Sequence, residues 1–285
     1  MLTYEFIQRA LIVSTVTAVI AGLLSCWLVL IGWSLMGDAV SHAVLPGVVI
    51  SYIIGWPFAI GALVAALIAV SLVGTVRERT TLKGDTAIGV VFTALFALGL
   101  VLVSITPAGT NLQEILFGNL LGISQDALVQ VLIFGVIAFV VMVALRRNIT
   151  AWAFDPSHAR AVGMPTGLIR AAVMVCLALV VVAAMQAVGV ILVVAMLITP
   201  GATAYLLTRR MNRMLVIAPL VAWVSSVAGI CLSYWYDVSA GGTIVLVQAG
   251  IFVLVYLFAP REGLVTAPLR RNRQRAADGT ARQPS

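Results

Sequence analysis

Two side chains that can bind metal ions, Asp38 and His42, lie in a segment that is otherwise almost free of charge. They lie in the apolar stretch 37–47 (GDAVSHAVLPG). Residues four apart share one face of a helix and lie about 6 Å apart along its axis. A carboxylate and an imidazole suit Mn(II), Fe(II) or Zn(II) rather than Cu(I). The spacing therefore predicts a metal-ion site on one helix face.

Pro46 follows His42 by four residues and has no N–H. A helical carbonyl at residue 42 would lose its partner, and we expect that oxygen to face the same cavity. Two side chains from one chain are too few for a closed site, so a second copy or water must complete it. The alternative is that Asp38 caps the second span and His42 bonds a neighbouring helix. Ionisable residues inside membrane spans are, however, functional by default.

The composition indicates a polytopic membrane protein built only of helices. Of 285 residues, 62% are hydrophobic and 9% charged, with a mean hydropathy of +1.14. A helix needs about 20 apolar residues to cross a bilayer. Strand alternation is absent, which excludes a β-barrel. We expect one transmembrane domain over residues 1–260 and a disordered basic tail over 261–285. The predicted spans are 10–33, 39–55, 57–76, 87–106, 126–145, 168–186, 188–208, 214–235 and 243–260.

The basic residues predict the topology. All of them except Arg9 gather in four clusters between apolar runs, and counting through the spans places all four on one side, the cytoplasm. This pattern also removes nucleic acid as a partner despite the net charge of +7. With nine spans the C-terminus is cytoplasmic and the N-terminus external; a re-entrant 188–208 run would reduce the count to eight. The clusters are Arg77, Arg79, Lys83; Arg146, Arg147, Arg160, Arg170; Arg209, Arg210, Arg213; and the arginines from Arg261 onward.

Other polar or helix-breaking residues are candidates for the permeation path. Glu114 lies in 111–124, which we expect to form a short external helix, and Asp237 precedes the last span. Each is a candidate for an external pathway of the ion. The alternative for Glu114 is a solvated acid at the membrane interface, and the alternative for Asp237 is a helix cap. Pro46 and the pair Pro200 and Gly201 predict helix breaks, with a gate as one use for them.

The stretch after the fifth span carries the signals of a short cytoplasmic helix over residues 155–163. Asp155 suits the N-cap, Pro156 the first position, and Gly163 the C-terminal stop. A rigid helix on this side would let a motor subunit push on the membrane domain. The alternative is a plain amphipathic connector.

These motifs together resemble the ABC-3 family of metal-importing permeases, which serve manganese, iron and zinc. The resemblance covers nearly the whole chain. It is carried by 37–47, by 115–119 (ILFGN), by Phe154-Asp155-Pro156 with Ala159 and Gly163, and by 187–192 (AVGVIL) through 199–201 (TPG).

The resemblance implies a fold related to the type II ABC importer permeases of vitamin B12 and siderophores, in a bacterial inner membrane. It implies two ABC ATPase subunits on the 155–163 helix, an extracytoplasmic metal-binding protein, and a second permease chain, identical or similar. It places Asp38 and His42 in the path of a transported ion, with manganese or iron favoured over zinc and no permanently bound cofactor.

The chain itself is not expected to be an enzyme. It has no GxxxxGK[ST] phosphate loop and no HExxH motif, with only two histidines in all. ATP hydrolysis would then belong to a partner subunit. A secondary transporter, coupled to protons through Asp38 and His42, is the alternative that needs no ATPase.

Overall fold

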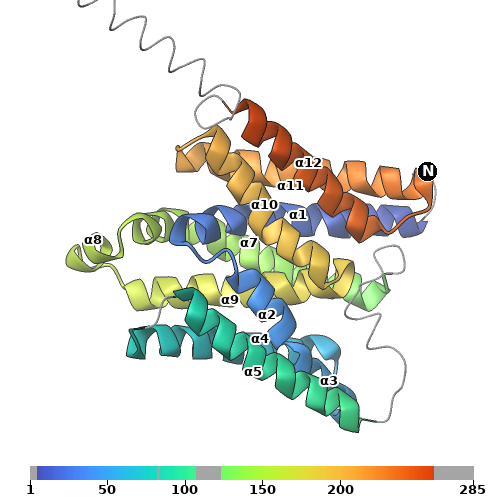
Figure 1. Ribbon diagram of the computed structural model, residues 1–285, viewed down its shortest axis with the longest axis horizontal. Helices are drawn as coiled ribbons and strands as arrows, with labels where there is room; N and C mark the ends of the chain where they lie inside the picture. Colours follow the sequence, from blue (N-terminus) through green and yellow to red (C-terminus); the bar gives the residue numbers. More distant parts are fainter. Residues whose placement is uncertain (1–4, 82–83, 107–122, 260–285) are drawn as a thin grey trace, which may run out of the picture.

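The fold is a bundle of α-helices. A computed structural model describes residues 5–81, 84–106 and 123–259. Figure 1 shows the helices, labelled and coloured in chain order. The helices are α1 (Glu5–Ile31), α2 (Met36–Ala43), α3 (Leu45–Ile54), α4 (Phe58–Arg79), α5 (Gly84–Ile105), α7 (Gln125–Phe154), α8 (Pro156–Ala161), α9 (Thr166–Val188), α10 (Val190–Leu207), α11 (Met211–Tyr236) and α12 (Ala240–Phe258).

Nine segments of the described chain are long and apolar enough to cross a membrane, with α2 and α3 together forming one of them. The expected helical membrane bundle is thus confirmed, and 188–208 forms a helix rather than a re-entrant loop. The fifth span was predicted too short. α7 continues past Arg146 and Arg147 to Phe154, because arginine is a good helix former and no glycine or proline interrupts it.

The basic ends of the helices gather at one end of the bundle. In Figure 1 the connections between α4 and α5, around α8, and between α10 and α11 all lie at the left. The turn between α11 and α12 lies at the opposite end. Glu114, most of the predicted external helix and the tail lie outside the described residues.

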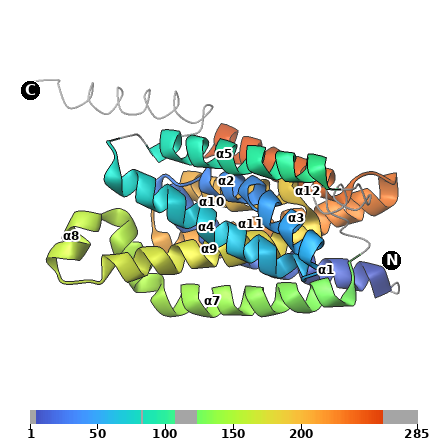
Figure 2. The same cartoon turned by 90° about the horizontal axis from the view of Figure 1, so that it is seen from below.

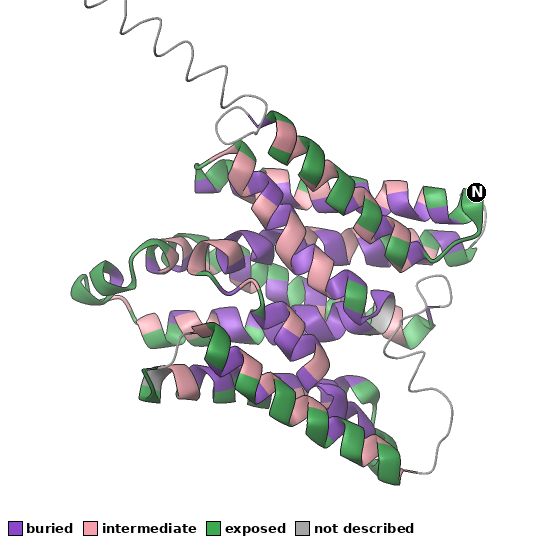
Figure 3. Cartoon of the chain, viewed as in Figure 1, coloured by how far each residue is buried: buried purple, intermediate pink, exposed green. Residues whose placement is uncertain are grey.

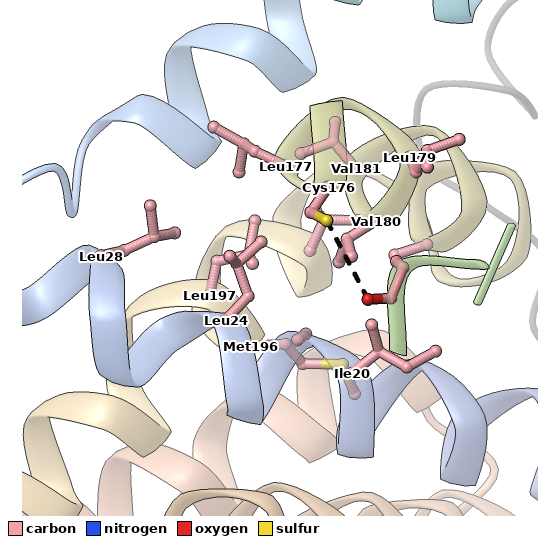
Figure 4. Close-up of a cluster of buried hydrophobic side chains, with 14 of the residues drawn as sticks. Ile20, Leu24, Leu28, Cys176, Leu177, Leu179, Val180, Val181, Met196 and Leu197 are labelled. Atoms are coloured by element: carbon pink, nitrogen blue, oxygen red, sulfur yellow. Dashed lines mark hydrogen bonds between the residues drawn. The ribbon is translucent and has the colours of Figure 1, made fainter. Parts of the chain in front are cut away.

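The interior of the bundle is apolar and is centred on α1. This helix packs against α7, α9, α10 and α11. Figure 4 shows Leu24 of α1 facing Leu177 of α9 and Leu197 of α10. Burial runs along the centre, while α5 and α12 expose long apolar faces (Figure 3). Apolar exposure of this extent is expected where lipid or another chain covers a helix.

The predicted break at Pro200 is not present, because α10 runs continuously from Val190 to Leu207. A neighbouring helix bonds the backbone of α10 on both sides of Pro200. The N–H of Gly201 donates to Ser25 Oγ of α1 at 2.9 Å, and the Ser25 hydroxyl lies 3.3 Å from the Ile198 carbonyl. A Cβ at Gly201 would lie 2.6 Å from the Ser25 carbonyl oxygen. Glycine is therefore required for this approach of α1 and α10.

The chain does break about three turns earlier, at the start of α10. Gly189 separates α9 from α10 with φ of 79° and ψ of 165°. Residues with a Cβ avoid this conformation, so the glycine permits the turn.

Candidate functional site

The helix α2 presents one open stripe, formed by Asp38 and His42. The other residues of α2, from Met36 to Ala43, are buried. The side chain of Asp38 is 41% exposed and that of His42 is 32% exposed. The helix is held by α5, α10, α4 and α9, and Figure 1 shows α2 beginning partway along the bundle. Both ionisable groups therefore face open space within the length of the spans.

The two functional groups are close enough to hold one ion. His42 Nε2 lies 3.5 Å from Asp38 Oδ1. Two ligand atoms at about 2.1–2.2 Å from one ion and near a tetrahedral angle are roughly 3.4 Å apart. The same distance also permits an ion pair when the imidazole is protonated. The predicted common face is confirmed, and a cation could bind there without a change of backbone.

The capping alternative for Asp38 is wrong. The span begins at Met36 with Leu35 in the cap position, and no side chain caps it. Asp38 lies inside the first turn, where a side chain projects from the helix instead of folding back on its N-terminus. Its carboxylate is consequently available to a ligand.

Two phenylalanines of α5 fix the imidazole of His42. The ring centroid of Phe92 lies 5.6 Å from that of His42, and Phe96 lies 5.4 Å away in an edge-to-face arrangement. On the far side of α2, a Cβ at Gly37 would lie 2.7 Å from the side chain of Leu197, so the glycine brings α2 close to α10. The His42 side of the stripe therefore rests against α5, and neither contact was evident from the sequence.

Pro46 coincides with a bend, as predicted. α2 ends at Ala43 and α3 begins at Leu45, while Val44 between them keeps helical angles (φ −76°, ψ −14°). Pro46 has no N–H to donate to the backbone carbonyl of His42, four residues earlier. The N–H of Val44 instead points to the carbonyls of Val40 and His42. The His42 oxygen thus has a backbone neighbour, so the expectation of a fully free third ligand is not supported.

The bend is followed by very close helix packing. A Cβ at Gly47 would lie 2.1 Å from the carbonyl oxygen of Gly61 on α4, and one at Gly61 would lie 2.2 Å from that of Gly47. The two glycines let the backbones of α3 and α4 touch, as small residues do in membrane bundles. The sequence separation of Gly47 and Gly61 does not indicate that they meet, so this contact could not be predicted from the sequence.

Asp237 is placed away from α2. It ends α11 in the left-handed conformation (φ 51°) and is exposed, and its neighbours Val238 and Ser233 exchange hydrogen bonds. Figure 1 places this turn at the end of the bundle opposite α8. Within the described residues, no group of three potential ligands forms. The structure therefore brings Asp38 and His42 together but does not add Asp237 to them.

The short helix α8 has the predicted start and stop. The Asp155 carboxylate accepts the N–H groups of Ser157 and His158, each at 2.9 Å. These bonds favour the charged form and lower the pKa of Asp155, the bond from His158 being the largest cause. Pro156 is the first residue of the helix, and Gly163 beyond its end has φ of 81°. The helix is thus built as the sequence indicated.

The surface around α8 is apolar as well as polar. Ala159 is buried against the bundle, while Phe154 and Val162 are more than three-fifths exposed. Figure 2 shows α8 projecting beyond the ends of the neighbouring helices. Exposed apolar residues at such a projecting end are typical of a protein contact surface.

A tryptophan pair connects the base of α8 to the start of α2. Trp152, at the end of α7, meets Trp33 edge to face with centroids 5.8 Å apart. Arg77 lies over the Trp33 ring at 5.0 Å, and the Trp33 carbonyl accepts the N–H of Met36. The helix that carries the stripe and the helix before α8 therefore share one packed cluster, which sequence reasoning missed.

Comparison with known proteins gives a single family. The model of the ABC 3 transport family matches residues 3–259. The manganese transport system membrane protein MntB of Synechocystis is 46% identical over 95% of this chain and 88% of its own. The chelated iron transport system membrane protein YfeD of Yersinia pestis is 44% identical over 90% of this chain and 86% of its own.

A solved structure has the same fold. PsaBC from Streptococcus pneumoniae, in complex with Fab, superposes with a TM-score of 0.82 and 39% identity over 91% of this chain and 94% of that one. The range matched by the family model, residues 3–259, includes α2, α8 and α10. With the family model and the relatives covering nearly the whole sequence, the chain belongs to the ABC 3 transport family.

Proposed function

We propose that this protein is the permease subunit of an ATP-driven importer of divalent transition-metal ions, with manganese or iron preferred over zinc. The observation that carries the proposal is the open stripe on α2, where Asp38 Oδ1 and His42 Nε2 lie 3.5 Å apart. The names of the relatives, which refer to manganese and iron, support the choice of metal. The ion is cargo, and no resident cofactor is required.

The incomplete set of ligands in the stripe supports the inference that two permease chains assemble. One chain offers a carboxylate and an imidazole, and the ion needs further ligands from water or from a second chain facing α2. Weak, incomplete coordination favours release as well as entry, which conduction requires. Neutral imidazole binds metal and protonated imidazole does not, so uptake should fall when His42 is protonated.

Energy is supplied from outside the chain. We infer that two ATPase subunits dock at α8, where Phe154 and Val162 are exposed, and that the tryptophan pair Trp33 and Trp152 passes their movement to α2. ATP is hydrolysed in those subunits and not here. A metal-binding protein delivers the ion at the opposite end, and the basic end of the bundle, with the C-terminus, faces the cytoplasm of a bacterial cell.

The test is uptake into liposomes that contain the permease with its ATPase subunits, with the binding protein added outside. Manganese, ferrous iron and zinc are compared with ATP, with a non-hydrolysable analogue, and with a pH gradient alone. The expected result is uptake only with hydrolysable ATP, and faster for manganese or iron than for zinc. Uptake by the permease alone under a pH gradient would contradict this proposal and favour the proton-coupled alternative.

A further inference from the structure

A groove of about 730 Å³ lies between α1, α7 and α11, apart from the α2 stripe. α7, which forms one wall, lies on the opposite side of the bundle from α5 (Figure 2). Most of the lining is apolar and includes Leu23, Phe139, Val143 and Leu220. Its size is within the range of about 300–1,000 Å³ that is usual for small-molecule sites.

The one charged group of the groove and its amide lie near one end, whereas the hydroxyl of Thr15 lies farther along α1. Arg146 of α7 and Asn212 of α11 line it where these helices approach the basic end of the bundle. Arg146 is exposed, and no described carboxylate forms an ion pair with it. The lining contains no acidic residue. The groove thus combines one unpaired cation with an uncharged, apolar channel.

The length of the groove corresponds to half a bilayer. From Asn212 to Trp223, α11 lines it over twelve residues, and the eleven steps between them rise about 16 Å along a helix. The hydrocarbon core of a bilayer is about 30 Å thick. A cation at the headgroup level and an apolar channel one leaflet deep match the two parts of a phospholipid.

We propose that this groove binds one anionic phospholipid of the cytoplasmic leaflet, with its phosphate at Arg146 and Asn212 and an acyl chain against Leu23, Phe139 and Leu220. Basic pockets between helices on this side recognise anionic headgroups in this manner. The inference rests on the membrane orientation in the proposed function, but not on metal or on the α2 stripe.

The test uses the assembled transporter in detergent, titrated with dioleoyl phosphatidylglycerol or dioleoyl phosphatidylcholine and measured by native mass spectrometry. The expected result is about fivefold preference for phosphatidylglycerol, the contribution of one arginine. Arg146→Gln should remove the preference, whereas Arg146→Lys should retain most of it. Arg147→Gln is the matched control, since Arg147 is exposed next to the groove but does not line it. Leu220→Trp should weaken the binding of both lipids by filling the channel.

Three results would overturn the inference: equal binding of the two lipids, an equal loss in Arg146→Gln and Arg147→Gln, and full competition by inorganic phosphate, which would indicate a site for soluble anions. Size-exclusion chromatography checks that each variant assembles. Because binding is measured without transport, a negative result here leaves the importer proposal standing, and failure of metal uptake leaves this one standing.

Discussion

The span formed by α2 and α3 and the span formed by α10 each contain a proline near the middle, yet they respond differently. At Pro46 the helix bends at Val44, which separates α2 from α3. At Pro200 the helix continues, with Ser25 of α1 bonded to both Gly201 and Ile198. Among the described residues, no side chain of another helix bonds the backbone next to Pro46 in the same way.

The difference shows that the effect of a proline is decided by its neighbours. A helix in lipid must satisfy its freed backbone groups internally or through another helix. α1 bonds the backbone of α10 on both sides of Pro200, and α10 becomes part of the static core. The bent span instead leaves Asp38 and His42 open on an otherwise buried helix. Function is thus expected in the bent span and stability in the bridged one.

The largest effect is expected from removing the stripe. Asp38→Ala and His42→Ala should each lower metal uptake by about tenfold or more, because each removes one of the two proposed ligands. Stability should change little, since both side chains are partly exposed. Initial rates of manganese uptake into liposomes measure this. Ser41→Ala is the control on the same helix, where the hydroxyl bonds only the Gly37 carbonyl. Normal uptake in both stripe variants would end the assignment of the site.

In the bridged span, Gly201→Ala should destabilise the fold. The new Cβ would lie 2.4 Å from Ser25 Oγ and 2.6 Å from the Ser25 carbonyl oxygen, so α1 and α10 must separate. Overpacking of this kind costs about 1–3 kcal/mol. Thermal unfolding of the purified transporter in detergent measures the change. Gly250→Ala, in α12 with nothing within 4 Å of its Cβ position, should leave stability unchanged or slightly higher. Equal effects of the two changes would argue against the close approach.

Ser25→Ala removes the bridge without adding volume. It leaves the Gly201 N–H and the Ile198 carbonyl without their partner, at an expected cost of about 0.5–2 kcal/mol, as for other interhelical hydrogen bonds in membranes. Ser226→Ala is the matched control, because Ser226 is buried and its hydroxyl bonds only its own helix at Ala222. The free energy of unfolding of both variants decides the question. If the two variants are equally stable, the bonds of Ser25 are not what keeps α10 continuous through Pro200.

Local signals made much of this structure predictable. Hydropathy located the spans, since lipid requires long apolar helices. The ends of α8 followed from Asp155, Pro156 and Gly163, because capping depends on neighbours in sequence. The common face of Asp38 and His42 followed from the helical repeat alone. Each of these features is decided within one or two turns of helix.

What could not be predicted depends on distant contacts. Ser25 meets Ile198 across 173 positions, and a serine in an apolar span gives no sign of its partner. The same holds for Phe92 and Phe96 beside His42, and for Trp33 against Trp152. The burial of the rest of α2, which makes its stripe the open face, likewise required four neighbouring helices.

The smallest effects are expected from replacing each of the two prolines with alanine, and these variants test the comparison between the two spans most directly. Pro46→Ala supplies an N–H that can reach the His42 carbonyl, so the span should straighten and turn the stripe relative to Phe92 and Phe96; uptake should fall a few-fold with stability retained. Pro200→Ala also restores an N–H, but the Ser25 bonds already hold α10 in place. Its effects on uptake and stability should be small, because the cost of proline inside a helix is already offset by α1. Uptake and thermal unfolding measured side by side separate the two. A larger loss of uptake in Pro200→Ala than in Pro46→Ala would reverse the assignment of function to the bent span and of stability to the bridged one.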